Sequence, residues 1–257
     1  MVIKSCLIKS VRVVGCAYCT TKNESGETTM LTIESLKKYH EKLNERIAYY
    51  NSVPVENLSV TISNGNMKVG NVPNVSLPAD KTCPHCKDCQ LACYDKKACL
   101  QYPNVMNARA KNYSIMNRSL KKYFADIKAW MQKDKGKFFR FHVGGDICSE
   151  EYLDGMVELT NEIIKHHWTY TKSQDIVNEY IKKYGGDWKK IAPNLVIMYS
   201  RWGYAPIDNP YNMPVFWCIV KGQEKPKDMY HCPGNCKICI ENHRGCPFGE
   251  SAWIDEH

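Results

Sequence analysis

The chain has 257 residues, of which 44% are hydrophobic and 24% charged, and its formal net charge is +8. This length and composition suit one large globular domain or two small ones with a buried core. No apolar run approaches the ~20 residues of a membrane span, and the lysines threaded through "MVIKSCLIKS" exclude the long apolar segment of a signal peptide. We therefore expect a soluble, cytoplasmic protein with no membrane partner.

Cysteine is unusually frequent, with 14 residues in the chain. In a reducing compartment, clustered cysteines bind metal more often than they form disulfides. The first group consists of Cys6, Cys16 and Cys19. It contains one C-x2-C pair, which is compatible with a metal site and equally with small buried residues beside a turn.

The next elements along the chain are a helix and a strand. Apolar residues recur at helical spacing over 33–51, with Thr32 as a candidate N-cap and Pro54 after the end. Alternation in "LSVTIS" predicts a strand over 58–63. A turn-rich, extended segment then leads directly into a second group of cysteines.

That second group lies in "TCPHCKDCQLACYDKKAC", where Cys83, Cys86, Cys89 and Cys93 are spaced x2, x2, x3. The spacing is that of the bacterial ferredoxin run and predicts a [4Fe–4S] cluster. Zinc is the alternative, because C-x2-C pairs also suit tetrahedral sulfur sites. Cys99 lies further on, and we expect it not to be a ligand.

Helices and strands alternate beyond this loop. Helical sequence runs from about residue 104 and breaks near Asn117-Arg118; Ser119, Ser149 and Ser173 are candidate N-caps of the helices that follow. Arg140 and His142 alternate within the first of the later strands, so they share a face, where they either line a site or only pack. These strands are expected over residues 137–143, 167–172, 194–200 and 214–220.

The third group of cysteines closes the chain, in "HCPGNCKICIENHRGC". Four thiols within fifteen residues can complete a tetrahedral zinc site or a fully ligated [4Fe–4S] cluster. His231 and His243 are alternative ligands, although we expect them to be neighbours of this site. The expected metal ligands here are Cys232, Cys236, Cys239 and Cys246.

This order of elements predicts an α/β fold with a parallel sheet. A full eightfold barrel needs ~250 residues, so we expect a partial (βα) barrel over 58–225, between an N-terminal extension over 1–57 and a C-terminal cysteine-rich metal-binding segment over 226–257. Because functional groups gather at the carboxyl ends of parallel strands, the cysteine loop, Gly144-Gly145-Asp146, Lys172 and Ser200-Arg201 should meet at one edge.

A cysteine loop after the first strand and a Gly-Gly-acid turn after the second resemble the layout of radical S-adenosylmethionine (SAM) enzymes. Several segments are also similar to the phage gene-product-88 family, whose activity is largely unassigned: "GNMKVGNVPNVSLP", "TCP", "FRFHVGGDI", "YTKS", "PNLVIMYS" and "CPGNCKIC". The resemblance covers about 58–257 and leaves the N-terminal extension outside it.

The resemblance implies one or two [4Fe–4S] clusters, SAM as a cofactor, an electron donor, and a substrate that the sequence does not identify. It also implies roles for individual residues. Asp146 would accept hydrogen bonds from the SAM ammonium, and Gly144-Gly145 would allow close backbone approach. Ser200 would bind a ribose hydroxyl, and Lys172 or Arg201 would pair with the SAM carboxylate or a substrate phosphate.

Two features depart from the radical SAM pattern. The usual loop is C-x3-C-x2-C, whereas this one has four thiols, and four ligands would leave no iron open for SAM. We therefore expect Cys86 to be spare and Cys83, Cys89 and Cys93 to be the ligands. The acid is Asp146, one methylene shorter than the usual glutamate.

Two alternatives remain at this stage. One is an electron carrier or redox sensor whose iron–sulfur clusters are closed. The other is a zinc-bearing phage protein that binds nucleic acid, since basic and aromatic residues interleave around the loop; it is compatible with an enzyme that modifies a nucleic acid. The residues concerned are Lys81, Lys87, Lys96, Lys97, Arg109, Lys111, Arg118, Lys121, Lys122, Tyr94, Tyr102 and Tyr113.

Overall fold

The computed structural model describes residues 30–65, 69–86 and 89–256. Cys6, Cys16 and Cys19 therefore lie outside the described residues, and their predicted metal-binding role stays a prediction. The α-helices are α1 Ile33–Ser52, α2 Tyr94–Gln101, α3 Pro103–Arg118, α4 Leu120–Lys133, α5 Glu150–Glu162, α6 Gln174–Lys183, α7 Trp188–Ile191 and α8 Cys236–Glu241, and the short 3-10 helices are η1 Val55–Asn57 and η2 Cys246–Phe248.

The strands form one seven-stranded sheet in the order β1-β2-β3-β4-β5-β7-β6, and every pair in it is parallel. The predicted α/β class with a parallel sheet is therefore confirmed. The sheet is open, so closure toward a barrel is not shown. The strands are β1 Asn74–Val75, β2 Phe138–Phe141, β3 His166–Thr171, β4 Leu195–Trp202, β5 Val215–Ile219, β6 Tyr230–His231 and β7 Ala252–Asp255.

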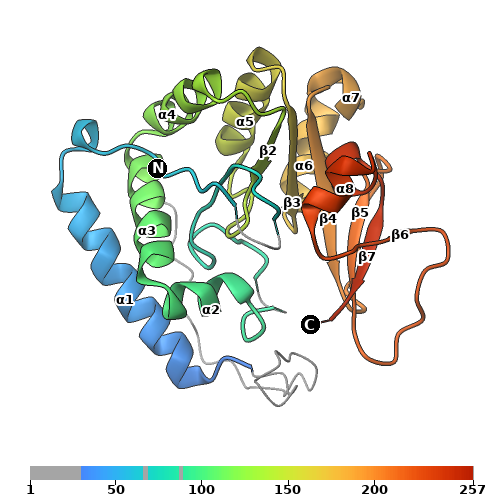
Figure 1. Ribbon diagram of the computed structural model, residues 1–257, viewed down its shortest axis with the longest axis horizontal. Helices are drawn as coiled ribbons and strands as arrows, with labels where there is room; N and C mark the ends of the chain where they lie inside the picture. Colours follow the sequence, from blue (N-terminus) through green and yellow to red (C-terminus); the bar gives the residue numbers. More distant parts are fainter. Residues whose placement is uncertain (1–29, 66–68, 87–88, 257) are drawn as a thin grey trace.

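The two faces of the sheet are covered by different parts of the chain. Phe139 and Ile197 face the main hydrophobic core, which they share with apolar side chains of α3, α4, α5 and α6. Because successive strand residues point to opposite faces, Trp168 and Met198 face the other way. They pack with Cys246 and the rest of the C-terminal segment. Figure 1 shows α8 on this second side, in front of β4 and β5.

The predicted helix starts are well reproduced. Thr32 caps α1 by accepting a hydrogen bond from the Ser35 amide, and Ser119 and Ser149 cap α4 and α5 in the same way. Side-chain acceptors at this position satisfy amides that have no partner inside the helix. The long helix α1 then packs along α3 at the β1 end of the molecule (Figure 1).

The strand predicted over 58–63 is wrong. These residues join no strand of the sheet, apart from a single antiparallel bridge between Ser63 and Asn74. Their backbone groups bind side chains instead: the Val60 amide donates to Asp126, and Asn112 both accepts from and donates to Thr61. Side chains of α3 and α4 thus provide hydrogen-bond partners for the backbone of this segment. The strand that precedes the cysteine loop is β1 instead.

The predicted division into 1–57, 58–225 and 226–257 stays a prediction. Strands β6 and β7, which belong to the predicted C-terminal segment, pair in the same sheet as the others. Among the described helices, none combines the length and the apolar character that crossing a bilayer requires.

A buried histidine gives this fold a testable pH dependence. His167 on β3 is 1% exposed. Burial lowers its pKa from 6.5 to about 4, although its hydrogen bond to the Asn194 carbonyl opposes the change. Between these pH values the unfolded chain binds a proton that the folded chain does not, so stability must fall as the pH falls.

We therefore expect His167 to contribute a slope of about 1.4 kcal/mol per pH unit to the free energy of unfolding within this window. Urea denaturation of the wild type and of His167→Gln, from pH 6.5 down to pH 4, measures the slope. The two stability curves should converge as the pH falls; parallel curves would contradict the assignment.

Candidate functional site

The carboxyl ends of β1 to β4 bring together the residues that the sequence analysis singled out. The cysteine loop leaves β1, Gly144-Gly145-Asp146 follows β2, Lys172 follows β3, and Ser200 lies near the end of β4. These strands are parallel neighbours, so their carboxyl ends share one edge of the sheet. The expected gathering of these four segments is therefore observed.

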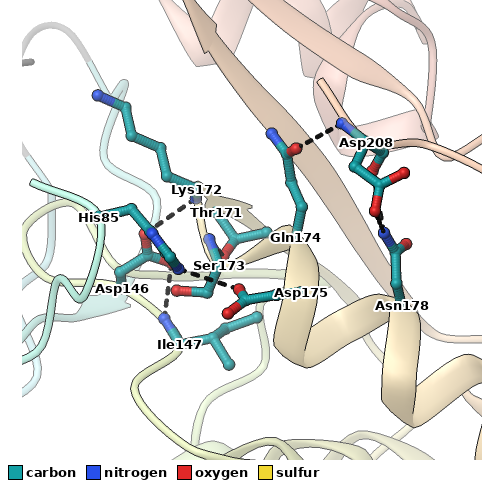
Figure 2. Close-up of polar contacts among 10 residues, drawn as sticks. All are labelled: His85, Asp146, Ile147, Thr171, Lys172, Ser173, Gln174, Asp175, Asn178 and Asp208. Carbon is teal, nitrogen blue, oxygen red and sulfur yellow. Dashed lines mark hydrogen bonds and ion pairs between the residues drawn. The ribbon is translucent and has the colours of Figure 1, made fainter. Parts of the chain in front are cut away.

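Asp146 lies at the centre of this edge and is 5% exposed. One carboxylate oxygen accepts a hydrogen bond of 2.7 Å from the Ile147 amide and the other accepts one of 2.9 Å from the Lys172 amide (Figure 2). Burial raises its pKa to about 6, although these amides and the Thr171 side chain act in the opposite direction. Asp146 thus ties the end of β2 to the end of β3, and a carboxylate has room for further donors.

The two glycines before Asp146 are required by close packing within the protein. A Cβ on Gly144 would lie 2.0 Å from a carboxylate oxygen of Asp95 in α2, and one on Gly145, whose φ is +90°, would lie 2.8 Å from Thr82. Only glycine fits such positions without displacing its neighbours. The cysteine loop and α2 therefore sit directly on the Gly-Gly turn.

Buried ion pairs anchor both ends of the cysteine loop. Lys96 is 1% exposed and its ammonium lies 2.6 Å from Asp80, which also binds His40. Arg109 of α3 pairs with Asp95 at 3.0 Å. Two members of the predicted basic surface, Lys96 and Arg109, are thus internal.

A third member, Arg118, donates hydrogen bonds to the carbonyl groups of Tyr50 and Val53 at the end of α1. Lys96, Arg109 and Arg118, three residues of the basic stretch that suggested a nucleic-acid surface, therefore make contacts within the protein. Single-strand binding needs a continuous positive groove lined by aromatic rings, so these contacts weaken that alternative.

The four thiols of the loop are electrostatic neighbours of one another. Burial, followed by the negative charge of Asp146 and then by Cys93 and Cys89, holds the pKa of Cys83 well above its usual value. Burial, Asp95 and Cys89 raise the pKa of Cys93 to about 12. Asp146 has the largest effect of any charged or thiol neighbour on the pKa of Cys83, ahead of Cys93, Cys89 and Cys86.

Cys86 differs from the other three in having polar side-chain partners of its own. Its sulfur is 3.6 Å from a carboxylate oxygen of Asp80 and 3.7 Å from the side-chain amide of Gln90. Cys99 is buried between α1 and α3 in a small apolar cluster. Among the described residues, no three or more histidine, cysteine or acidic side chains are arranged as a ready metal site.

Two further residues at this edge were not identified as functional from the sequence. His85, in the cysteine loop, lies 3.0 Å from Asp175 in the first turn of α6 (Figure 2), so the loop reaches across the ends of the strands. The Ser173 hydroxyl is buried and has no hydrogen-bond partner among the described residues. The sequence indicates Ser173 as an N-cap; it does precede α6, but its side chain makes no capping bond.

Lys172 and Ser200 share one face of the sheet, since each follows the paired residues Thr171 and Tyr199 by one position. The Lys172 ammonium lies 5.6 Å above the Trp202 ring. Arg201 lies on the opposite face and stacks on Trp217, so the structure does not bring it to Asp146.

The C-terminal thiols form a separate group, on the face of the sheet opposite the main core. The electrostatic neighbours of Cys246 are Cys232, Cys236 and Cys239. They lie beside the part of the C-terminal segment that packs on β3 and β4. The prediction of two distinct cysteine groups therefore agrees with their placement, while metal binding at either remains to be tested.

Comparison with known proteins gives one family. Residues 35–230 match the family described as Gene product 88. No curated protein and no solved structure matches the chain. The predicted resemblance to this family is thus confirmed, whereas the radical SAM-like layout stays a prediction. The match begins before residue 58, includes most of α1, and ends just before Cys232.

The buried ion pair at Lys96 generates a testable prediction. Replacing Lys96 with methionine leaves Asp80 without its main cation, and breaking a buried pair from one side costs about 3–5 kcal/mol. Lys122→Met is the matched control, because Lys122 pairs with Asp126 within one helix near the surface and such pairs contribute about 1 kcal/mol or less. Urea denaturation compares the two losses, and equal losses would contradict the anchoring role.

Proposed function

From the premise that this chain belongs to the Gene product 88 family, we propose that it is an iron–sulfur enzyme of the radical SAM type. The observation that carries the proposal is that the cysteine loop and the buried Asp146 meet where parallel strands end, with Asp146 as the leading charged neighbour of the Cys83 thiol. A radical SAM site needs this combination: thiols for a cluster beside an acceptor for the SAM ammonium. The substrate is not part of the proposal.

Cys83, Cys89 and Cys93 are the proposed cluster ligands. All four thiols of the loop are electrostatic neighbours, and Cys86 is set aside because its sulfur already contacts Asp80 and Gln90. Three ligands leave one iron of a [4Fe–4S] cluster without a protein ligand, as SAM binding requires. The described side chains must rotate to converge on a cluster, and the thiols must lose their protons, as metal binding generally demands.

The partial-barrel geometry is part of the same proposal. Strands β1 to β5 follow one another in sequence order and are parallel, with helices α3 to α6 against one face. That order is what a (βα) barrel has before it closes. It favours a site at the carboxyl ends over one on the helix-covered face.

When bound, the cluster and SAM would together supply a carbon-centred radical able to take a hydrogen atom from a substrate, and that chemistry belongs to the cofactors. The chain's own groups would bind and orient. Asp146 keeps lone pairs for an ammonium after accepting from the Ile147 and Lys172 amides. The unpartnered Ser173 hydroxyl is a further donor on the same turn.

Ser200 and Lys172, on neighbouring strands, extend this polar edge on one face of the sheet. In the proposed site Ser200 would bind a ribose hydroxyl, and Lys172 would face the carboxylate of SAM or an anionic group of the substrate. Arg201 has no such role, because it stacks on Trp217 on the opposite face.

Iron and sulfide analysis of protein purified without oxygen tests the ligand set. We expect about four iron and four sulfide per chain at this loop, lost in Cys83→Ser, Cys89→Ser and Cys93→Ser. Cys86→Ser should keep them. Cys148→Ser is the control, since Cys148 packs against the main core; loss of iron in Cys86→Ser but not in Cys83→Ser would refute the assignment.

SAM binding separates the enzyme from an electron carrier or redox sensor with a closed cluster. The electron paramagnetic resonance signal of the reduced wild type should change when SAM is added, because an open iron gains a ligand. An unchanged signal, with iron and sulfide present, would leave the closed-cluster alternative in place of this proposal.

Asp146→Asn tests the ammonium site. It removes one charge, and a hydrogen bond to a charged group contributes about 1.5–3 kcal/mol, so the affinity for SAM should fall by about 10-fold or more while the iron content is kept. Asp175→Asn, at the exposed pair with His85, is the control. Equal SAM affinities of Asp146→Asn and wild type in equilibrium dialysis would exclude this role.

A further inference from the structure

The C-terminal cysteines gather on the face of the sheet opposite the main core. Cys236 begins α8 and Cys239 lies one turn later. A Cβ added to Gly245 would lie 3.4 Å from the Cys239 sulfur, so the chain folds back against this thiol and places Cys246, at the start of η2, beside it. Cys239 and Cys246 are 5% and 4% exposed.

A buried arginine of the sheet points at the same thiols. Nη1 of Arg140 is 3.8 Å from the Cys236 sulfur. Its guanidinium lies 4.7 Å above the ring of Tyr170, whose side chain is hydrogen bonded to Cys246. Nε of Arg140 is buried and has no hydrogen-bond partner within the described part of the chain. The side chain therefore lies beside Cys236, with Cys246 and Cys232 as further electrostatic neighbours, while its Nε donor has no partner among the described residues.

This guanidinium lacks a counter-ion. An arginine stays charged in proteins, and a buried charge is costly unless it is paired. Over the described residues, no carboxylate forms an ion pair with Arg140. The groups that face it are Tyr94, Tyr170, Cys236 and Cys246, so negative charge at this position has to come from thiolates. Four thiolates around a divalent ion leave two negative charges in excess.

We propose that the four C-terminal thiols bind one Zn²⁺ as a closed tetrathiolate site and that Arg140 is its buried counter-ion. The spacing C-x3-C-x2-C-x6-C suits a tetrahedral site made by two turns. The described thiols are not arranged as a ready metal site, so the sulfurs must rotate to about 2.3 Å from the ion. A single ion is smaller than a four-iron cluster and asks for less movement of the buried Cys239 and Cys246. This inference is independent of the proposed function.

The proposed zinc site fixes the segment over residues 232–251, here called the strap, against one face of the sheet. At one end the C-terminal segment continues into β7, beside β5 and β6. At the other end α8 meets the turn before β1, where a Cβ on Gly70 would lie 2.5 Å from the Lys237 side chain. Four protein ligands leave no open coordination position, so the ion is structural. It stabilises the strap over the amino-terminal half of this face, where Phe248 contacts Phe138 and His166.

Metal analysis of the full-length protein tests the ligands. Zinc and iron are measured together in wild type, Cys239→Ser, Cys83→Ser and Cys148→Ser. We expect about one zinc ion per chain, lost only in Cys239→Ser. Zinc retained in Cys239→Ser, or iron lost in its place, would overturn the proposal. Cys83→Ser separates the two sites, since loss of iron there with zinc retained leaves this inference intact whatever SAM does.

Zinc affinity tests the counter-ion. Competition with a chromogenic chelator should show Arg140→Met and Arg140→Gln binding zinc about 10- to 100-fold more weakly than wild type, the usual effect of losing a group next to the ligands. Arg140→Lys keeps the charge and should restore most of the affinity. Arg118→Met is the matched control, because Arg118 binds only backbone carbonyls of α1 and α3.

Wild-type zinc affinity in either neutral variant would overturn the role of Arg140. If neither neutral variant folds, Arg140→Lys alone tests the counter-ion role. A folded, zinc-loaded Arg140→Lys supports a requirement for charge, and a folded Arg140→Lys that binds no zinc rejects it.

Discussion

The arrangement of this molecule depends on how one long loop is fixed to the end of a parallel sheet. Two ion pairs hold it there, Asp80 with Lys96 and Asp95 with Arg109. Both are largely withdrawn from water, so removing one partner is more costly than at a surface pair. Gly144 completes the attachment, because a side chain at that position would collide with Asp95. These contacts hold the loop in the position where Cys83 is an electrostatic neighbour of Asp146.

The sheet then separates two kinds of cysteine site. The loop lies at the carboxyl ends of the strands, whereas the C-terminal thiols lie on the face opposite the main core, where Cys236 contacts Arg140 of β2 and Cys246 contacts Tyr170 of β3. Tyr94, which follows Cys93, is an electrostatic neighbour of Arg140. In the two proposals, the closed C-terminal site stabilises the fold and the open site in the cysteine loop carries the reaction.

Much of this architecture is visible in the sequence. The alternation of strands and helices, the serine caps of α4 and α5, and the meeting of four segments at one edge follow from local patterns. The error at 58–63 has a tertiary cause, since Asn112 and Asp126 lie more than fifty positions away in the chain and satisfy the backbone there. The buried positions of Lys96 and Arg109 could not be predicted either, because a lysine-rich stretch has the same composition whether it faces water or an aspartate.

The central claim is that the cysteine loop carries an iron–sulfur cluster at the end of the sheet. Anomalous diffraction from crystals grown without oxygen, recorded at the iron and zinc absorption edges, tests it most directly. The account predicts an iron peak beside Cys83, Cys89 and Cys93 and within reach of Asp146. A zinc peak at that position, with no iron, would contradict the claim and make the loop a structural element.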